Sequence, residues 1–207
     1  MENELLKIFD DNKNPIGVAT RKEVHELGYW HETFQCWFIR NERGIDYVYL
    51  QIRSKNKKDY PNLIDITTAG HLLANESVQD GIREIREELG VDIEYNELIS
   101  LGTIPYSVRR EHFIDKEIAH VFLYKTQYDW PDYVLQQDEV SGMVKVKFTD
   151  FSNLWLDEKS EIQIEGFEVE DEGKQTFFSK RVNKSAFVPH ENSYYESIIK
   201  GIAVAIM

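Results

Sequence analysis

The stretch from Gly70 to Val91, GHLLANESVQDGIREIREELGV, constrains the fold of this chain more than any other. Four of its apolar residues recur at the spacing of one helical face, which predicts an amphipathic helix with a buried stripe: Val78, Ile82, Ile85 and Leu89. The predicted helix begins at a capping box, with Ser77 at the N-cap and Asp80 reaching back to it. It ends at Gly90, where a left-handed residue commonly closes a helix.

The same helix carries a cluster of carboxylates. Glu84, Glu87 and Glu88 stand at i, i+3 and i+4, so a helix brings them to one side. Like charges at this spacing repel by roughly a few tenths of a kcal/mol per pair unless a cation lies between them. A solvated acidic face, partly neutralised by an Arg83–Glu87 pair, is one interpretation. Clustered carboxylates also suit Mg²⁺ or Mn²⁺, and the Gly-His loop and glutamate upstream favour this second interpretation.

These residues resemble the sequence box of the Nudix hydrolases, G-x5-E-x7-R-E-U-x-E-E-x-G-U, in which U is aliphatic. Gly70 and Glu76 fit its first part, and residues 83–91 fit its second part without exception. One departure lies between the two parts. Six residues separate Glu76 from Arg83, where the family usually has seven. We expect the shortening to affect the junction before the helix, and with it the role of Glu76, but to leave the helix unchanged.

The resemblance also implies a fold and a metal site. Strands before and after a central helix favour an α/β/α sandwich around a mixed β-sheet, which is also the fold of the Nudix family. In that family the positions matching Glu84, Glu87 and Glu88 hold one to three Mg²⁺ or Mn²⁺ ions, with help from the Gly70 carbonyl. The resemblance therefore implies metal-assisted cleavage of a diphosphate bond.

Turn residues and apolar periodicity divide the rest of the chain into short elements. We expect strands at residues 5–9, 17–20, 33–40, 46–53, 64–66, 98–106, 117–125 and 143–148. We expect helices at residues 21–28, from 150 onward and at 193–207. Residues 162–169 and 176–182 form either an added hairpin or a helical insertion. These elements predict one domain over 1–207, with an N-terminal hairpin, a core at about 30–156 and a C-terminal extension at 157–207.

Composition narrows the class of partner. The 207 residues, 42% hydrophobic, can form a substantial globular core, and no apolar run is long enough to cross a membrane. A single cysteine, Cys36, excludes an internal disulfide and agrees with a reducing cytoplasm; the first residues do not resemble a signal peptide. A net charge of −13 argues against binding nucleic acid by bulk attraction. A phosphorylated small molecule would need a local basic cluster or a metal.

A second, narrower resemblance covers roughly residues 20 to 150. The segments EVHELGYWHETFQCWFIR, QIRSKNKKDYP, TAGHLLANES and DKEIAHVFLY resemble bacterial isopentenyl-diphosphate isomerases, a branch of the Nudix superfamily. In that branch the positions matching His25, His31, His71 and Glu117 bind a divalent metal, and Asp115 falls near a further ligand. Imidazole and carboxylate together suit Mn²⁺, Zn²⁺ or Fe²⁺. The remaining histidines are interpreted as ordinary structural residues: His112, His120 and His190.

The same resemblance implies how a diphosphate is held. The positions matching Arg53 and Lys57 bind the substrate diphosphate in the isomerase branch. An arginine fork with a nearby lysine suits that group, and with Lys55 and Lys58 these residues form the dense basic patch of an acidic chain. A solvated loop is the structural alternative.

The choice between hydrolysis and isomerisation depends on one position. The isomerase has a cysteine immediately before its Gly-His pair, and here Ala69 stands there, which cannot transfer a proton. The complete box also favours hydrolysis. We therefore predict a hydrolase acting on a nucleoside diphosphate derivative or a similar phosphorylated metabolite. Glu139 is the first choice for general base, with Glu84 and Glu117 as alternatives.

Two other functions are compatible with these residues: an isopentenyl-diphosphate isomerase, and a non-catalytic Nudix domain that senses a nucleotide. Residues 157–207 carry no motif that indicates a function. They could form a homodimer interface or a lid.

Overall fold

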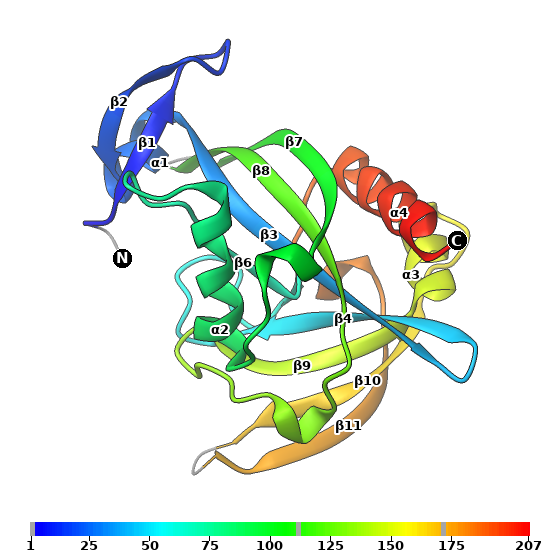
Figure 1. Cartoon of the computed structure of the whole chain (residues 1–207). Helices are drawn as coiled ribbons and strands as arrows, with labels where there is room; N and C mark the ends of the chain where they lie inside the picture. The colour runs from blue at the N-terminus through cyan, green and yellow to red at the C-terminus, as the bar shows by residue number, and fades with distance from the viewer. Residues whose placement is uncertain (1–2, 111–112, 171–172) are drawn as a thin grey trace.

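The computed structural model describes residues 3–110, 113–170 and 173–207. Eleven strands of this part form one sheet, and helices cover both of its faces (Figure 1). The strands are β1 (Leu5–Phe9), β2 (Pro15–Thr20), β3 (Trp30–Glu42), β4 (Ile45–Arg53), β5 (Ile64–Asp65), β6 (Thr68–His71), β7 (Ile99–Arg110), β8 (Phe113–Lys125), β9 (Val140–Lys147), β10 (Ile162–Val169) and β11 (Gln175–Val182). The α-helices are α1 (Arg21–Leu27), α2 (Arg83–Leu89), α3 (Phe148–Trp155) and α4 (Asn192–Ile206). The described residues also include the 3₁₀ turns η1 (Val78–Ile82), η2 (Tyr95–Glu97), η3 (Trp130–Asp132) and η5 (Lys184–Ala186).

The sheet is mixed, as predicted. Strand β3 lies at its centre, parallel to β8 and antiparallel to β4 and β6. The main path runs β11-β10-β9-β4-β3-β1-β2, and β7 joins through β8. In the described part of the chain, no helix is both long and apolar enough to cross a membrane.

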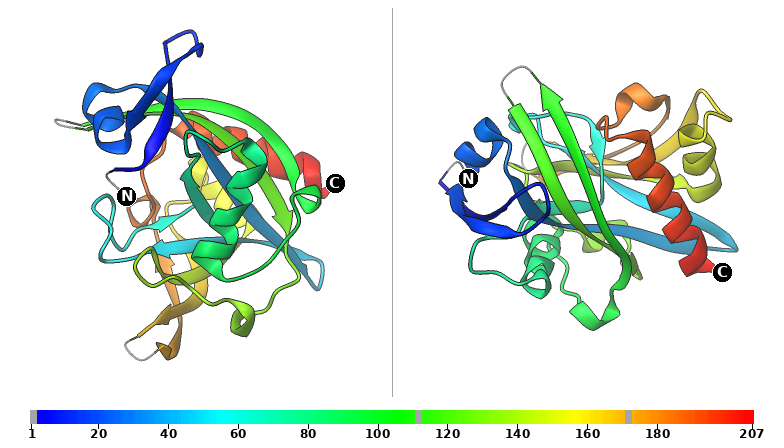
Figure 2. Two further views of the ribbon diagram at one scale, coloured as in Figure 1. Left: turned by 60° about the vertical axis from the view of Figure 1, so that its left-hand side comes forward. Right: turned by 90° about the horizontal axis from the view of Figure 1, so that it is seen from above.

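Alternation along the strands gives the sheet a core on each side. Even-numbered residues of β3 such as Phe34 pack with Ile85 and Leu89 of α2. Odd-numbered residues such as Trp37 pack on the other side with Phe151 of α3 and with α4. The α/β/α sandwich follows from this two-sided burial, and the views in Figure 2 show α2 and α4 on opposite sides of the sheet.

The segments outside the central sandwich also form the predicted hairpins. Strands β1 and β2 pair as the N-terminal hairpin, and Leu6 of β1 is buried against Val24 of α1. Strands β10 and β11 pair over their whole length and extend the sheet beyond β9. The hairpin alternative for this region is therefore correct, and the helical insertion is wrong.

The structure corrects two expectations about the box. The segment around Gly70 is not a loop, because it forms strand β6 and pairs with β3. The helix expected from Ser77 is a 3₁₀ turn as far as Ile82, and the α-helix starts only at Arg83. A 3₁₀ helix rises about 2.0 Å per residue against about 1.5 Å in an α-helix, so the five residues of η1 span roughly 2.5 Å more than they would in an α-helix. Gly90 closes α2 with φ of 69°, as predicted.

Candidate active site

A cavity of about 540 Å³ gathers residues from segments that are far apart in the sequence. Its lining includes ten residues selected from the sequence: His25, Arg53, Lys57, Gly70, His71, Glu84, Glu87, Glu88, Glu117 and Glu139. His31 lies against the same region but is fully buried. The cavity therefore places both candidate metal clusters and the basic residues in one space.

Gly70 is needed because a carboxylate lies directly against it. A Cβ at this position would come within 2.1 Å of the Glu84 carboxyl carbon. The neighbouring Glu88 is only 5% exposed and accepts a hydrogen bond of 3.3 Å from the Ala69 amide. Glu87 is the open member of the set, with about half of its side chain exposed. Strand β6 and helix α2 thus hold two carboxylates inside the cavity and one at its mouth.

Burial opposes ionisation of the two inner carboxylates. It raises the pKa of Glu84 to about 7, although the charge of Arg83 acts in the opposite direction. Burial and the charge of Glu84 together raise the pKa of Glu88 to about 8. A bound cation would stabilise two such carboxylates, which are costly to ionise side by side, in the anionic form. The donor set, all carboxylate oxygen, fits a hard divalent ion.

Arg83 organises the acidic cluster from one side. Its Nε and Nη2 donate to the two carboxylate oxygens of Glu76 at 2.5 and 3.0 Å. Its Nη1 donates to Glu84 at 2.6 Å and to Glu87 at 3.1 Å, and Nη2 also reaches the His71 carbonyl at 3.0 Å. The shortened spacing before Arg83 therefore preserves a two-pronged Glu76–Arg83 pair. Glu76 positions the arginine.

The histidine cluster is built from four elements. His25 comes from the end of α1, His31 from β3 and His71 from β6, and their ring nitrogens lie within 4.8 Å of one another. Asp115 and Glu117 of β8 share the face of β3 that carries His31, and they form a second such group with it. The Asp115 Oδ1 atom lies 3.6 Å from His25 Nε2 and 3.5 Å from His31 Nε2.

Several atoms of this cluster are buried without a hydrogen bond to the described residues. They are Nε2 of His31, Nε2 of His71 and Oδ1 of Asp115. Buried polar atoms normally have hydrogen-bond partners, and two of these three, His31 Nε2 and Asp115 Oδ1, face each other at 3.5 Å, so the cluster could accept a shared ligand. Burial lowers the pKa of His31 to about 4 and that of His71 well below its ordinary value, which keeps both in the neutral, metal-binding form. Imidazole and carboxylate donors fit a transition metal.

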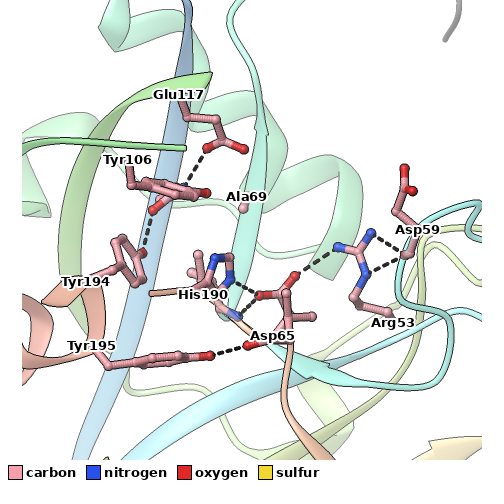
Figure 3. A network of polar contacts seen from close by, with 12 residues as sticks. Arg53, Asp59, Asp65, Ala69, Tyr106, Glu117, His190, Tyr194 and Tyr195 are labelled. Atoms are coloured by element: carbon pink, nitrogen blue, oxygen red, sulfur yellow. Dashed lines mark hydrogen bonds and ion pairs between the residues drawn. The ribbon is translucent and has the colours of Figure 1, made fainter. Parts of the chain in front are cut away.

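The basic residues expected to hold phosphate already have partners. Arg53, at the end of β4, donates to Asp65 Oδ2 at 2.9 Å and to the Asp59 carbonyl at 2.9 and 3.2 Å (Figure 3). Lys57 forms an ion pair with Glu139, the first choice for general base. Both pairs line the cavity, so these side chains reach the space that a diphosphate would occupy.

The C-terminal extension contributes residues that the sequence pattern does not reveal. The expectation that His190 is an ordinary structural histidine is incomplete, because it lines the cavity and its Nε2 lies 2.9 Å from Asp65 Oδ1. The Val188 amide donates to the Ile64 carbonyl at 2.8 Å and fixes this segment beside β5. No spacing pattern links residue 190 to the box, so the sequence carries no signal for it. His120 does pair on the surface, with Glu32, while His112 lies outside the described residues.

Ala69 faces a polar network at the inner wall of the cavity (Figure 3). Gln35 Nε2 donates to the Tyr106 hydroxyl at 3.2 Å and to Glu117 at 3.0 Å. Burial and the charge of Asp115 raise the pKa of Glu117 to about 8. The alanine presents only a methyl group to these residues and can neither give nor accept a proton.

Comparison with known proteins agrees with these features. No family model matches the chain. It is 41% identical over 203 residues to an uncharacterised Nudix hydrolase of Clostridium acetobutylicum, and the match covers 98% of each protein. The chain belongs to the Nudix hydrolases. It is accordingly a Nudix pyrophosphohydrolase, of a family that generally uses divalent metals.

Other relatives confirm both sequence resemblances. Nudix hydrolase 3 of Arabidopsis thaliana is 29% identical over 74% of this chain, which spans 20% of the plant protein. An isopentenyl-diphosphate Delta-isomerase of Photorhabdus laumondii is 27% identical over 67% of the chain and 75% of that enzyme.

Solved structures confirm the Nudix fold. A MutT/nudix protein of Enterococcus faecalis matches with a TM-score of 0.51 at 15% identity, over 84% of this chain and 61% of that one. A Deinococcus radiodurans protein matches with a TM-score of 0.52 at 17% identity, over 70% and 85%.

Proposed function

We propose that this Nudix enzyme hydrolyses a diphosphate linkage in a nucleoside diphosphate derivative or a similar phosphorylated metabolite, with Mg²⁺ or Mn²⁺ as cofactor. One observation carries the proposal. Two buried carboxylates with pKa values raised to about 7 and about 8 adjoin a third, more exposed one, at the wall of a cavity that also holds Arg53 and Lys57. Acidic metal ligands and basic phosphate ligands facing one space are what hydrolysis of a diphosphate requires.

Glu84, Glu87 and Glu88 would hold one to three ions, together with the Gly70 carbonyl. Bound there, the metal would neutralise diphosphate oxygens and lower the pKa of a coordinated water. Arg53 and Lys57 would donate hydrogen bonds to the phosphate oxygens and orient the bond to be cleaved. Arg53 already has its guanidinium fixed by Asp65, so it needs little reorganisation to do so.

Glu139 would accept the proton of the attacking water. In the structure its carboxylate is paired with Lys57, so the two roles are linked. Movement of the Lys57 ammonium onto a substrate phosphate would release Glu139 as a base only when substrate is present. Glu84 and Glu117 are the alternative bases, and both have raised pKa values, of about 7 and about 8.

The histidine cluster would hold a second divalent ion, bound by His25, His31, His71 and Glu117 with Asp115. Its three unpartnered buried atoms support this assignment. The same cluster is the specific observation that favours a second candidate function, isopentenyl-diphosphate isomerisation, because the isomerase branch binds its metal at the matching positions. Ala69 argues against that reaction, since its side chain, beside Tyr106 and Glu117, has no exchangeable proton.

A turnover assay with variants of the box tests the proposal. The full chain is incubated with Mg²⁺ or Mn²⁺ and a panel of dinucleoside and sugar-linked diphosphates, and phosphate-containing products are measured. Glu87→Gln and Glu88→Gln should each lower kcat by about two orders of magnitude or more, the usual cost of removing one charge-stabilising group. Glu196→Gln, on α4 and outside the cavity, serves as the matched control. Full activity in the two box variants would contradict the proposal.

A further inference from the structure

The ring of His190 has a fixed orientation in the cavity wall, and one of its nitrogens has no hydrogen bond to the described residues. Its side chain is 9% exposed and lines the cavity. Three tyrosine rings surround it, with centroids at 5.6 Å for Tyr106, 5.1 Å for Tyr194 and 5.7 Å for Tyr195. Its Nε2 lies 2.9 Å from Asp65 Oδ1. Packing and this hydrogen bond together fix the orientation of the imidazole.

The state of Asp65 determines which ring nitrogen carries the proton. Burial raises the pKa of Asp65, but its interaction with His190 and the charge of Arg53 outweigh this effect and bring the value to about 2. Asp65 is therefore a carboxylate anion, which can only accept hydrogen bonds. Nε2 of His190 therefore carries a hydrogen, and in the neutral imidazole this leaves Nδ1 as an acceptor.

Nδ1 of His190 is the ring nitrogen that remains available for a hydrogen bond in the cavity. Within the described part of the chain it has no hydrogen-bond partner, and it is not among the atoms sealed from solvent. The polar groups beside it are used by one another, because the Tyr194 hydroxyl donates to Gln35, and Gln35 donates to Tyr106. A molecule in the cavity therefore meets, at Nδ1 of His190, a polar atom whose direction the protein has set.

We propose that the Asp65–His190 pair is the recognition subsite for the organic group attached to the diphosphate, with His190 Nδ1 accepting a hydrogen bond from an O–H or N–H of that group. This inference rests on the proposed function and names its substrate class: diphosphates of hydroxylated or N–H-bearing groups rather than of plain hydrocarbons. Arg53 links the two subsites, because it contacts Asp65 of the recognition subsite and is itself one of the residues proposed to bind the diphosphate.

The physical reason for selectivity is desolvation. A hydrocarbon group placed against His190 would remove water from Nδ1 without replacing the hydrogen bond. Leaving a buried acceptor unsatisfied lowers affinity by roughly ten- to a hundredfold. The isopentenyl group has no hydrogen-bond donor, so the subsite distinguishes a hydroxylated diphosphate from isopentenyl diphosphate.

The test compares two substrate types in matched variants of the full chain with Mg²⁺. His190→Phe keeps a ring in the tyrosine cage but removes Nδ1. It should raise KM for nucleoside diphosphate sugars roughly ten- to a hundredfold with little change in kcat, and leave KM for isopentenyl diphosphate unchanged or lower. His190→Gln keeps an N–H for Asp65 and offers an amide oxygen, so it should recover part of the loss. His120→Gln, at the surface pair with Glu32, is the control.

Three results would overturn the inference. One is an equal change for both substrate types in His190→Phe, which would indicate a merely structural role. Another is a wild-type preference for the hydrocarbon diphosphate with hydrolysis intact. If His190→Phe does not fold, as judged by thermal unfolding, His190→Leu, which also lacks a ring nitrogen, carries the test, and an unchanged KM and substrate ratio in it would count against the inference. Lack of metal-dependent turnover on every substrate would instead refute the proposed function.

Discussion

Replacing Arg83 by methionine tests the explanation given for the shortened box. The change keeps an unbranched apolar stem but removes the guanidinium that binds Glu76 and Glu84, whose side chains are only 12% and 13% exposed. Removing one partner of a buried ion pair costs about 3–5 kcal/mol. Because the Arg83 side chain is 28% exposed and solvent screens part of its charge, we expect roughly 2–4 kcal/mol of lost unfolding free energy.

The assay is thermal unfolding in buffer with a chelator, so that no metal compensates for the lost cation. For a chain of this size each kcal/mol shifts Tm by about 2–4 °C, which gives a fall of roughly 4–16 °C. Arg86→Met is the matched control on the same helix, because Arg86 and Asp92 form an exposed pair worth at most about 1 kcal/mol. Glu76→Gln in the Arg83→Met background should be less costly than in the wild type. Equal Tm values for the two arginine variants, or additive effects of Glu76 and Arg83, would refute the reasoning.

Three further predictions concern other parts of the cavity. Asp65→Asn should cost stability at neutral pH. The folded-state pKa of Asp65 is about 2, against an ordinary 3.8, so its contribution to the unfolding free energy is present above about pH 4 and is lost as pH falls toward 2. Urea unfolding of the wild type and the variant from pH 7 to 2.5 measures this loss, and a difference in unfolding free energy that stays constant over that range would contradict the prediction. His31→Ala should lower the bound Mn²⁺ or Zn²⁺ measured by mass spectrometry after loading and dialysis, and unchanged content would argue against the histidine site. Ala69→Cys should allow deuterium exchange into isopentenyl diphosphate that the wild type does not catalyse, and rapid exchange by the wild type would revive the isomerase hypothesis.

Local spacing accounts for the features that are predictable from the sequence. Residues three and four apart on a helix must share a face, so the spacing of Glu84, Glu87 and Glu88 is enough to place their carboxylates together. The end of the helix at Gly90 is predictable for a similar reason, since the left-handed backbone conformation at a helix end favours glycine. The order of strands before and after a central helix indicates the α/β/α sandwich. The long-range clustering of His25, His31 and His71 follows only from resemblance to the isomerase branch.

The features that the sequence does not show depend on contacts between distant segments. Asp65 and His190 are 125 positions apart, and no periodicity relates them. The Lys57–Glu139 pair joins two loops whose path is set by the sheet, so neither loop indicates the pair by itself. The sequence does not reveal the 3₁₀ turn at Val78–Ile82, because the spacing of its apolar residues also fits an α-helix. Only the need to place Arg83 beside Glu76 distinguishes the two conformations.

Isotope labelling tests the central claim, metal-dependent hydrolysis at phosphorus, most directly. The full chain is incubated with Mg²⁺ and a diphosphate substrate in water enriched in both ¹⁸O and deuterium, and the products are analysed by mass spectrometry. We predict one ¹⁸O in a phosphate product per turnover, dependent on the metal and lost in Glu88→Gln, and no deuterium at carbon. Deuterium in an isomerised organic group, with its diphosphate intact and free of ¹⁸O, would contradict the account.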